Sequence, residues 1–338
     1  MADTKREIER KYESDESDLP DLTRVAGVAA VVDRGVAHLD ATYYDTADER
    51  LAASGITLRR RTGGSDAGWH LKFPVAPGVR DEMRAPLSDT VPRALAVLLR
   101  SRVRDTALLP LVRLRSERDV RHLLDADGRL LAEVSADVVH AERLTGDGRT
   151  VQWTEIEVEL ADGGDPAFLD KVDKHLRKAG VRPSRSASKL ARALAETGTS
   201  PSERPAGPPA TAGDHILAYV RAQRDALIAL DPAVRRDLPD SVHRMRVATR
   251  RLRSALRSYG KVLDRAATDP LGAELKWLAG ELGADRDHEV LTDRLTAALD
   301  ELPRTLVDGP VHTRLRTWSH ARHTGSRRRL VAVLDGRR

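Results

Sequence analysis

A proline-rich break divides this 338-residue chain into two parts of different periodicity, and it restricts the possible folds more than any other feature. Residues 199–213 contain four prolines, two glycines and no bulky apolar side chain, which is typical of an exposed linker. Before the break, apolar and polar residues alternate in short stretches, whereas after it the spacing is helical nearly throughout. We therefore predict a domain at residues 1–198, a linker at 199–213 and a second domain at 214–338.

The first domain is predicted to be α+β. Stretches of alternating polarity predict eight strands, at residues 6–12, 38–45, 56–61, 68–73, 81–87, 111–124, 129–140 and 150–160. Helical spacing predicts helices at residues 20–34, 91–102, 166–179 and 187–195. The second domain is predicted to be an all-α bundle, with helix breaks at Pro232, Pro239, Pro270 and Pro303.

Charge separates the two domains as well. The whole chain has 57 Lys and Arg against 52 Asp and Glu, a net charge of +5. Residues 213–338 have 24 basic against 17 acidic residues, whereas residues 1–212 have 33 against 35. A basic second half predicts a polyanionic partner for that half alone.

Two absences exclude whole classes of function. The chain has no Cys, which excludes disulfides, thiolate metal sites and a Cys nucleophile. No apolar run approaches the roughly 18 residues that span a bilayer, and the first residues are charged. We expect a cytoplasmic protein with no membrane partner.

Carboxylates recur with a period of two on the first and the last predicted strands. Glu7, Glu9 and Lys11 share one strand face, while Ile8 points the other way. The last strand repeats the pattern at Glu155, Glu157 and Glu159. A solvated strand face is the alternative, but neighbouring carboxylates repel each other. Bound Mg²⁺ or Mn²⁺ explains the pattern, because hard divalent cations prefer carboxylate oxygens.

Basic side chains have the same period on the strands between these two. They form same-face sets at Arg59 with Arg61, His70 with Lys72, and Arg80 with Glu82 and Arg84, and they continue to Arg118. An open sheet with a wet surface is one interpretation of this alternation. A closed barrel with a charged lumen explains more of it at once.

These motifs, in this order, resemble the CYTH domain of the triphosphate tunnel metalloenzymes. The resemblance rests on Glu-x-Glu-x-Lys at 7–11, a Tyr-Tyr-Asp-Thr run that ends in Leu-Arg-x-Arg at 43–61, Trp-x-Leu-Lys at 69–72, Glu-x-Glu-x-Glu at 155–159, and Ser-Lys at 188–189. It implies an eight-stranded antiparallel β tunnel with flanking helices. It also implies that the tunnel binds a triphosphate and cleaves the terminal phosphate with divalent metal.

The resemblance assigns site residues one by one. It implies metal ligands at Glu7, Glu9, Asp137, Glu155, Glu157 and Glu159. It implies phosphate-binding cations at Lys11, Arg59, Arg61, Lys72, Arg84, Arg118 and Lys189. We expect inorganic triphosphate as the substrate, because these strands contain no identifiable base-binding pocket. Adenylate cyclase, thiamine triphosphatase and a noncatalytic polyphosphate-binding protein are the alternatives.

A predicted helix at residues 241–260 has one purely basic face. That face contains His243, Arg246, Arg250, Arg253 and Arg257 within an arc of about 80°. An apolar stripe lies about 150° away and is suited to packing in a bundle. A solvated face is the alternative, but such faces usually mix charges of both signs. The absence of an acid from this face favours a bound polyanion.

Residues 242–256 and 282–290 resemble the CHAD domain, a helical module that commonly follows a CYTH domain. The resemblance implies that the basic helix binds inorganic polyphosphate. Specific nucleic-acid binding is not expected, because no aromatic residue lies on the basic face where a base would stack. Family members usually contain two related helical halves, and residues 214–338 cover little more than the first. We therefore predict an incomplete domain.

Overall fold

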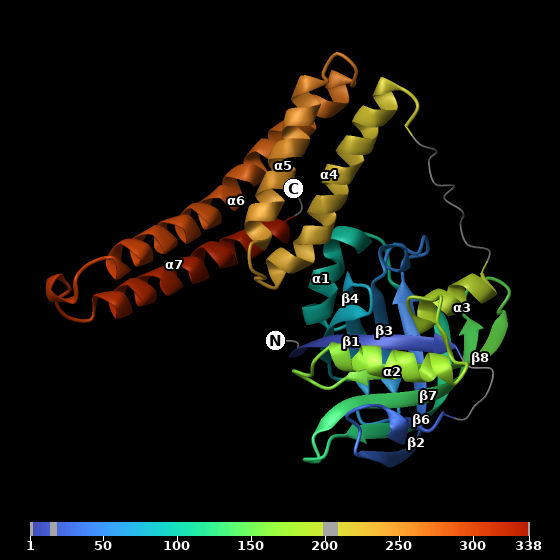
Figure 1. Ribbon diagram of the computed structural model, residues 1–338. Coiled ribbons are helices and arrows are strands. Elements are labelled where there is room, and N and C mark those ends of the chain that lie inside the picture. The colour runs from blue at the N-terminus through green and yellow to red at the C-terminus, as the bar shows by residue number, and fades with distance from the viewer. Residues whose placement is uncertain (1–2, 14–18, 199–208, 337–338) are drawn as a thin grey trace. The chain divides into compact units, whose positions relative to one another are not determined.

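The computed structural model describes residues 3–13, 19–198 and 209–336 and divides into two compact units, residues 1–202 and 203–338 (Figure 1). Residues 199–208 of the predicted linker lie outside the described residues. The first helix of the second unit begins at Ala212. The side chain of Thr211 caps this helix by accepting a hydrogen bond from the amide of Asp214.

An antiparallel barrel forms the first unit and confirms the predicted eight-stranded tunnel. Its strands are β1 (Asp3–Glu13), β2 (Ala30–Asp45), β3 (Thr57–Thr62), β4 (Gly68–Ala76), β5 (Val79–Ala85), β6 (Leu109–Leu124), β7 (Leu130–Arg143) and β8 (Thr150–Leu160). They neighbour one another in the order β5-β4-β3-β2-β6-β7-β8-β1. Residues 3–8 of β1 pair with β5, and residues 9–13 pair with β8, which closes the barrel. The short β9 (Arg182–Pro183) pairs with the end of β1.

The barrel is inverted, with apolar side chains on the outside and charged side chains inside. Helix α1 (Arg93–Val103) packs against the outward faces of β3, β4 and β5, around the buried Trp69. Helix α2 (Ala167–Lys178) covers the outward faces of β1, β7 and β8, including Tyr12 and Ile156. These helices bury the apolar outward faces of the strands. The inward faces therefore do not have to form an apolar core and can carry charged side chains.

Helix α3 (Lys189–Thr197) closes one end of the barrel. Its Leu190 and Leu194 pack with Tyr43 and Trp153, which belong to the inward-facing sets of β2 and β8. The side chain of Ser188 caps the helix by accepting a hydrogen bond from the amide of Ala191, 3.0 Å away. The first residue of α3 is therefore fixed at the inner end of the tunnel.

The predicted helix at residues 20–34 is wrong. The structure has a 3-10 turn at Leu22–Arg24, and β2 begins at Ala30, eight residues before the predicted strand. Residues 30–33 pair with residues 121–124 of β6, so pairing with a long neighbour overrides the local helical spacing. Gly27, with φ of 102°, also interrupts a helix there.

Asp45 fixes the turn that follows β2. Its buried carboxylate accepts hydrogen bonds from the amides of Thr46, Leu51 and Ala52 at 2.7, 2.9 and 2.8 Å. These bonds hold the loop that carries Leu51 into the core beside α1. The Asp of the Tyr-Tyr-Asp-Thr run therefore has a structural position outside the tunnel.

We expect Asp45→Ala to lower the free energy of unfolding of the barrel by about 3 kcal/mol, because it leaves buried amides without an acceptor. Asp45→Asn keeps one carbonyl acceptor and should lose less. Hydrogen–deuterium exchange of β3 in increasing urea measures both changes in the full chain. Equal stability of wild type and Asp45→Ala would contradict this role.

Four long helices form the second unit, as predicted for the second domain. They are α4 (Ala212–Arg235), α5 (Ser241–Ser258), α6 (Arg265–Asp300) and α7 (Val311–Leu334). Its core includes Val234, Val242, Met245, Leu282 and Leu330. None of the described helices is long and apolar enough to cross a membrane.

The predicted helix breaks at Pro232 and Pro270 are wrong, whereas Pro239 and Pro303 do lie between helices. Pro232 lies inside α4 and Pro270 inside α6. Each is close to an end of its helix, where a missing amide hydrogen bond disturbs few turns.

Candidate active site in the tunnel

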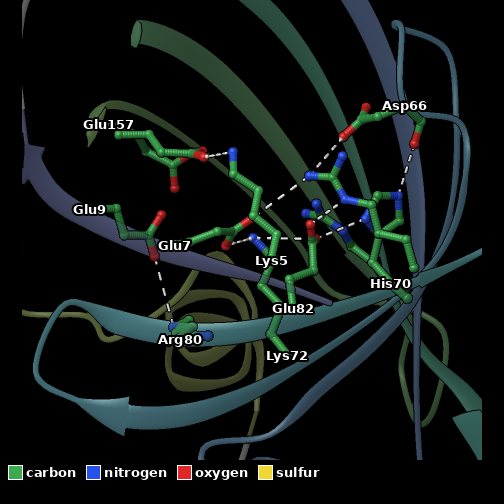
Figure 2. Close-up of polar contacts among 12 residues, drawn as sticks. Lys5, Glu7, Glu9, Asp66, His70, Lys72, Arg80, Glu82 and Glu157 are labelled. Carbon is green, nitrogen blue, oxygen red and sulfur yellow. Dashed lines mark hydrogen bonds and ion pairs between the residues drawn. The ribbon is translucent and has the colours of Figure 1, made fainter. Parts of the chain in front are cut away.

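A charged cavity of about 620 Å³ lies inside the barrel. Period-two geometry of β1 places Lys5, Glu7, Glu9 and Lys11 in its lining, while Tyr12 lies in the outer core. Figure 2 shows Glu7 and Glu9 lying along one side of the site. The alternation on the first strand therefore turns four charged residues into the lumen.

Strand β8 supplies the second set of carboxylates. Glu157 and Glu159 line the cavity, and Glu159 lies directly across from Glu9 in the register of β8 and β1. Glu157 contacts the ammonium of Lys11 and accepts a hydrogen bond from Arg118 at 2.8 Å. The acids of β1 and β8 thus face a common space, as the sequence predicted.

Each of these carboxylates is balanced by a basic side chain from the wall. Glu7 contacts Lys72, and Glu9 lies 3.4 Å from Lys11. Lys5 binds Glu159 at 2.7 Å. Burial raises the pKa of Glu7 to about 7, because it disfavours the ionised carboxylate. A further cation nearby would stabilise this ionised form.

Two other predicted metal ligands, Asp137 and Glu155, face the inside of the barrel at the end closed by α3 and do not line the cavity. Asp137 is fully buried and accepts two hydrogen bonds from Arg118, both 2.7 Å. Glu155 accepts a hydrogen bond from Trp153 Nε1 at 2.6 Å. With Glu157 they form a carboxylate cluster whose ligand atoms lie within 4.8 Å of one another, close enough to hold a metal ion.

The predicted phosphate-binding cations converge on the cavity. Lys11, Arg59, Arg61, Lys72, Arg84, Arg118 and Lys189 all contribute to its lining. Arg59 donates a hydrogen bond to the hydroxyl of Tyr43 at 3.3 Å, and its buried Nε has no hydrogen-bond partner among the described residues. Burial, together with the nearby Arg59 and Arg118, lowers the pKa of Arg61 to about 9. The repulsion between Arg59 and Arg61 on one strand face favours a bound anion.

Lys5, Asp66 and Glu82 complete the site beyond the predicted ligands. Lys5 continues the alternation of β1 and was detectable from it. Asp66 comes from the loop between β3 and β4, contacts Arg61 and lies 3.9 Å from Arg84. No strand period predicts a loop residue, so its position required the structure. Glu82 lines the cavity and forms a hydrogen bond with His70 Nδ1 at 2.8 Å (Figure 2).

The basic face of α5 has the predicted arrangement in the second unit. Arg250, Arg253 and Arg257 are exposed, while His243 and Arg246 are half-buried. The opposite face, with Met245 and Leu252 among others, is buried. Arg246 also lies 3.9 Å from Asp287 of α6, so one acid approaches the row from a neighbouring helix.

A closed antiparallel barrel with a charged lumen, joined to a helical unit with a basic face, defines the class of tunnel proteins that the motifs indicated. Residues 5–194 match the CYTH domain, and residues 218–338 match the CHAD domain. The chain therefore belongs to the CYTH domain family and carries a CHAD domain. Enzymes of the CYTH family act on triphosphates and depend on metal.

Known relatives share most of this chain. Two uncharacterised proteins of Mycobacterium tuberculosis, from strains CDC 1551 and H37Rv, are each 41% identical to it over 348 residues. Each match covers 98% of this chain and 67% of the relative. A Bacillus halodurans protein, provisionally assigned as an adenylate cyclase, has 17% identity and a TM-score of 0.41, covering 56% of this chain and 97% of that one. A Pyrococcus horikoshii protein has 18% identity and a TM-score of 0.36, covering 56% and 99%.

Proposed function

We propose that the tunnel hydrolyses inorganic triphosphate with Mg²⁺ or Mn²⁺, and that the basic face of α5 binds inorganic polyphosphate. The adjacent inward Arg59 and Arg61 are the observation that carries the first part, because their charges repel each other and their buried Nε atoms have no hydrogen-bond partner among the described residues. A triphosphate would supply oxygen acceptors for the guanidinium groups of Arg59 and Arg61.

The donor set fits a hard divalent ion. Glu7, Glu9 and Glu159 supply carboxylate oxygens, and the chain has no Cys to favour a softer metal. A divalent ion held by these residues would supply positive charge for phosphate oxygens and would lower the pKa of an attacking water. Lys72 and Lys11 contact these acids through long side chains that also line the cavity, so they can turn to phosphate oxygens as substrate enters.

The arginines hold the substrate and stabilise its developing charge. Arg59 and Arg61 extend from adjacent inward positions of β3, and Arg118 extends from β6. Guanidinium groups in fixed positions bind phosphoryl oxygens through two hydrogen bonds and stabilise charge without reorganising. Because water performs the attack, this chemistry requires no side-chain nucleophile.

The lining favours a substrate without a base. Tyr43 is the one phenolic or indole ring among the described residues of the cavity lining, and its hydroxyl is bonded to Arg59. A stacking platform for adenine or thiamine is therefore not evident within the described part of the tunnel. Phosphate release from inorganic triphosphate, with Mg²⁺ or Mn²⁺ and again with EDTA, tests this proposal.

Asp66 competes with a substrate phosphate for the tunnel cations. Its carboxylate contacts Arg61 and lies 3.9 Å from Arg84, where a phosphate oxygen would sit in the proposed complex. We expect Asp66→Asn to lower KM for triphosphate about threefold to tenfold and to change kcat less than twofold, since only the competing charge is removed. Steady-state kinetics separate the two constants, and an unchanged or higher KM would reject this competition.

A further inference from the structure

The carboxylate cluster of Asp137, Glu155 and Glu157 has the spacing of a metal site but already contains a cation of the chain. Asp137 comes from β7 and pairs in register with Glu155 of β8, so the two acids are forced together by the sheet. Asp137 is 0% exposed and Glu155 is 4% exposed. Buried acids this close require compensating positive charge.

Lys189 supplies that charge from the first position of α3. Its Nζ lies 3.0 Å from Asp137, 2.6 Å from Glu155 and 2.7 Å from Glu157. These are ion-pair distances, so the ammonium lies among the three carboxylates as their common counter-charge.

The backbone holds Lys189 in this position independently of the ion pairs. Ser188 caps the helix, and Arg80 donates a hydrogen bond to the carbonyl of Ala187. Leu190 and Leu194 anchor α3 in the apolar core at the end of the barrel. The position of the Lys189 ammonium is therefore fixed by a packed helix.

The cluster is also balanced in charge. Arg118 binds Asp137 and Glu157, and Lys11 contacts Glu157, so three cations of the chain face three carboxylates. A metal ion would lie about 2.0–2.6 Å from the same oxygens that hold Lys189. The two cations would then almost overlap, and one must leave.

We propose that Lys189 takes the place of a divalent ion in the Asp137–Glu155–Glu157 cluster, and that it is a positioning residue rather than a phosphate ligand. This inference rests on the proposed function, in which the tunnel binds a divalent metal. That metal would then be held by Glu7, Glu9 and Glu159 on the facing wall. Those three acids line the cavity, and their partners Lys72, Lys11 and Lys5 line it too. Asp137 and Glu155 do not line it.

Binding of Mn²⁺ to the full chain, followed by the electron paramagnetic resonance signal of free Mn²⁺, tests the proposal without requiring turnover. Lys189→Met removes the ammonium and should bind one equivalent more Mn²⁺ than wild type. Lys189→Met combined with Glu155→Gln removes a ligand of the new site and should lose that equivalent. Lys189→Arg retains a cation and should match wild type. Equal stoichiometry in Lys189→Met and wild type would overturn the proposal.

Glu155→Gln alone gives a second test that does not depend on the folding of Lys189→Met. If Lys189 fills the cluster, this variant binds as much Mn²⁺ as wild type. If the cluster holds a metal in the wild type, the variant loses one equivalent, which overturns the proposal. Loss of the proposed activity with these stoichiometries intact would count against the proposed function instead.

Discussion

Replacing Glu7 and Glu9 together by glutamine is expected to reduce metal-dependent phosphate release from triphosphate by at least about 100-fold. Glutamine preserves the shape of both side chains but removes two negative charges from the lumen side of β1. Lys72 and Lys11, which contact these acids, would remain in the tunnel. The variant should therefore retain affinity for phosphate while losing affinity for the metal, as Mn²⁺ titration would show.

A matched control removes the same charge outside the tunnel. Glu117 on β6 and Asp105 after α1 are both exposed, so Glu117→Gln with Asp105→Asn should leave turnover within about twofold of wild type. Thermal unfolding of both variants checks that the barrel is intact. Equal loss of activity in the control and the tunnel variant would contradict metal binding by Glu7 and Glu9 of β1.

Replacing Arg246, Arg250 and Arg253 by glutamine is expected to weaken polyphosphate binding roughly 10- to 100-fold and to make it less dependent on salt. Each arginine that neutralises a phosphate releases a counterion on binding, so the slope of affinity against salt should fall in the variant. Triphosphate hydrolysis should continue, because the CYTH unit is compact in itself and contains the whole tunnel.

The control for this experiment keeps the net charge of the triple variant. Arg221, Arg294 and Arg314 are exposed on α4, α6 and α7, so they do not form one row. Their replacement by glutamine should weaken binding much less, as isothermal titration with polyphosphate of fixed length at several salt concentrations would show. Equal losses in the two triple variants would reject the basic face of α5 as the binding surface.

The sequence predicted the lumen well because strand geometry turns an alternating pattern into two faces. Glu7, Glu9, Glu157 and Glu159 alternate with outward apolar residues, so a closed barrel leaves them one place to lie. Strand alternation also predicts the inward positions of Arg59 and Lys72. It does not apply to loops, so it could not predict Asp66, which reaches the tunnel because of the path of the loop between β3 and β4.

Local spacing also failed where distant segments decide the structure. Residues 20–34 have a helical pattern, yet pairing with β6 makes the later part a strand. Asp137 and Glu155 were predicted as metal ligands, and the structure buries both at the end of the barrel that α3 closes. A helix that closes the barrel and carries Lys189 into the acids cannot be inferred from the alternation of β7 and β8.

The central claim is that this tunnel is a metal-dependent triphosphatase, and the most direct measurement is phosphate release by the wild-type chain. Inorganic triphosphate, ATP and thiamine triphosphate would be compared at equal concentration with Mg²⁺, Mn²⁺ or EDTA. We expect the highest kcat/KM with inorganic triphosphate, in the presence of either metal, and no turnover in EDTA. Absence of turnover on all three substrates with both metals would contradict the claim.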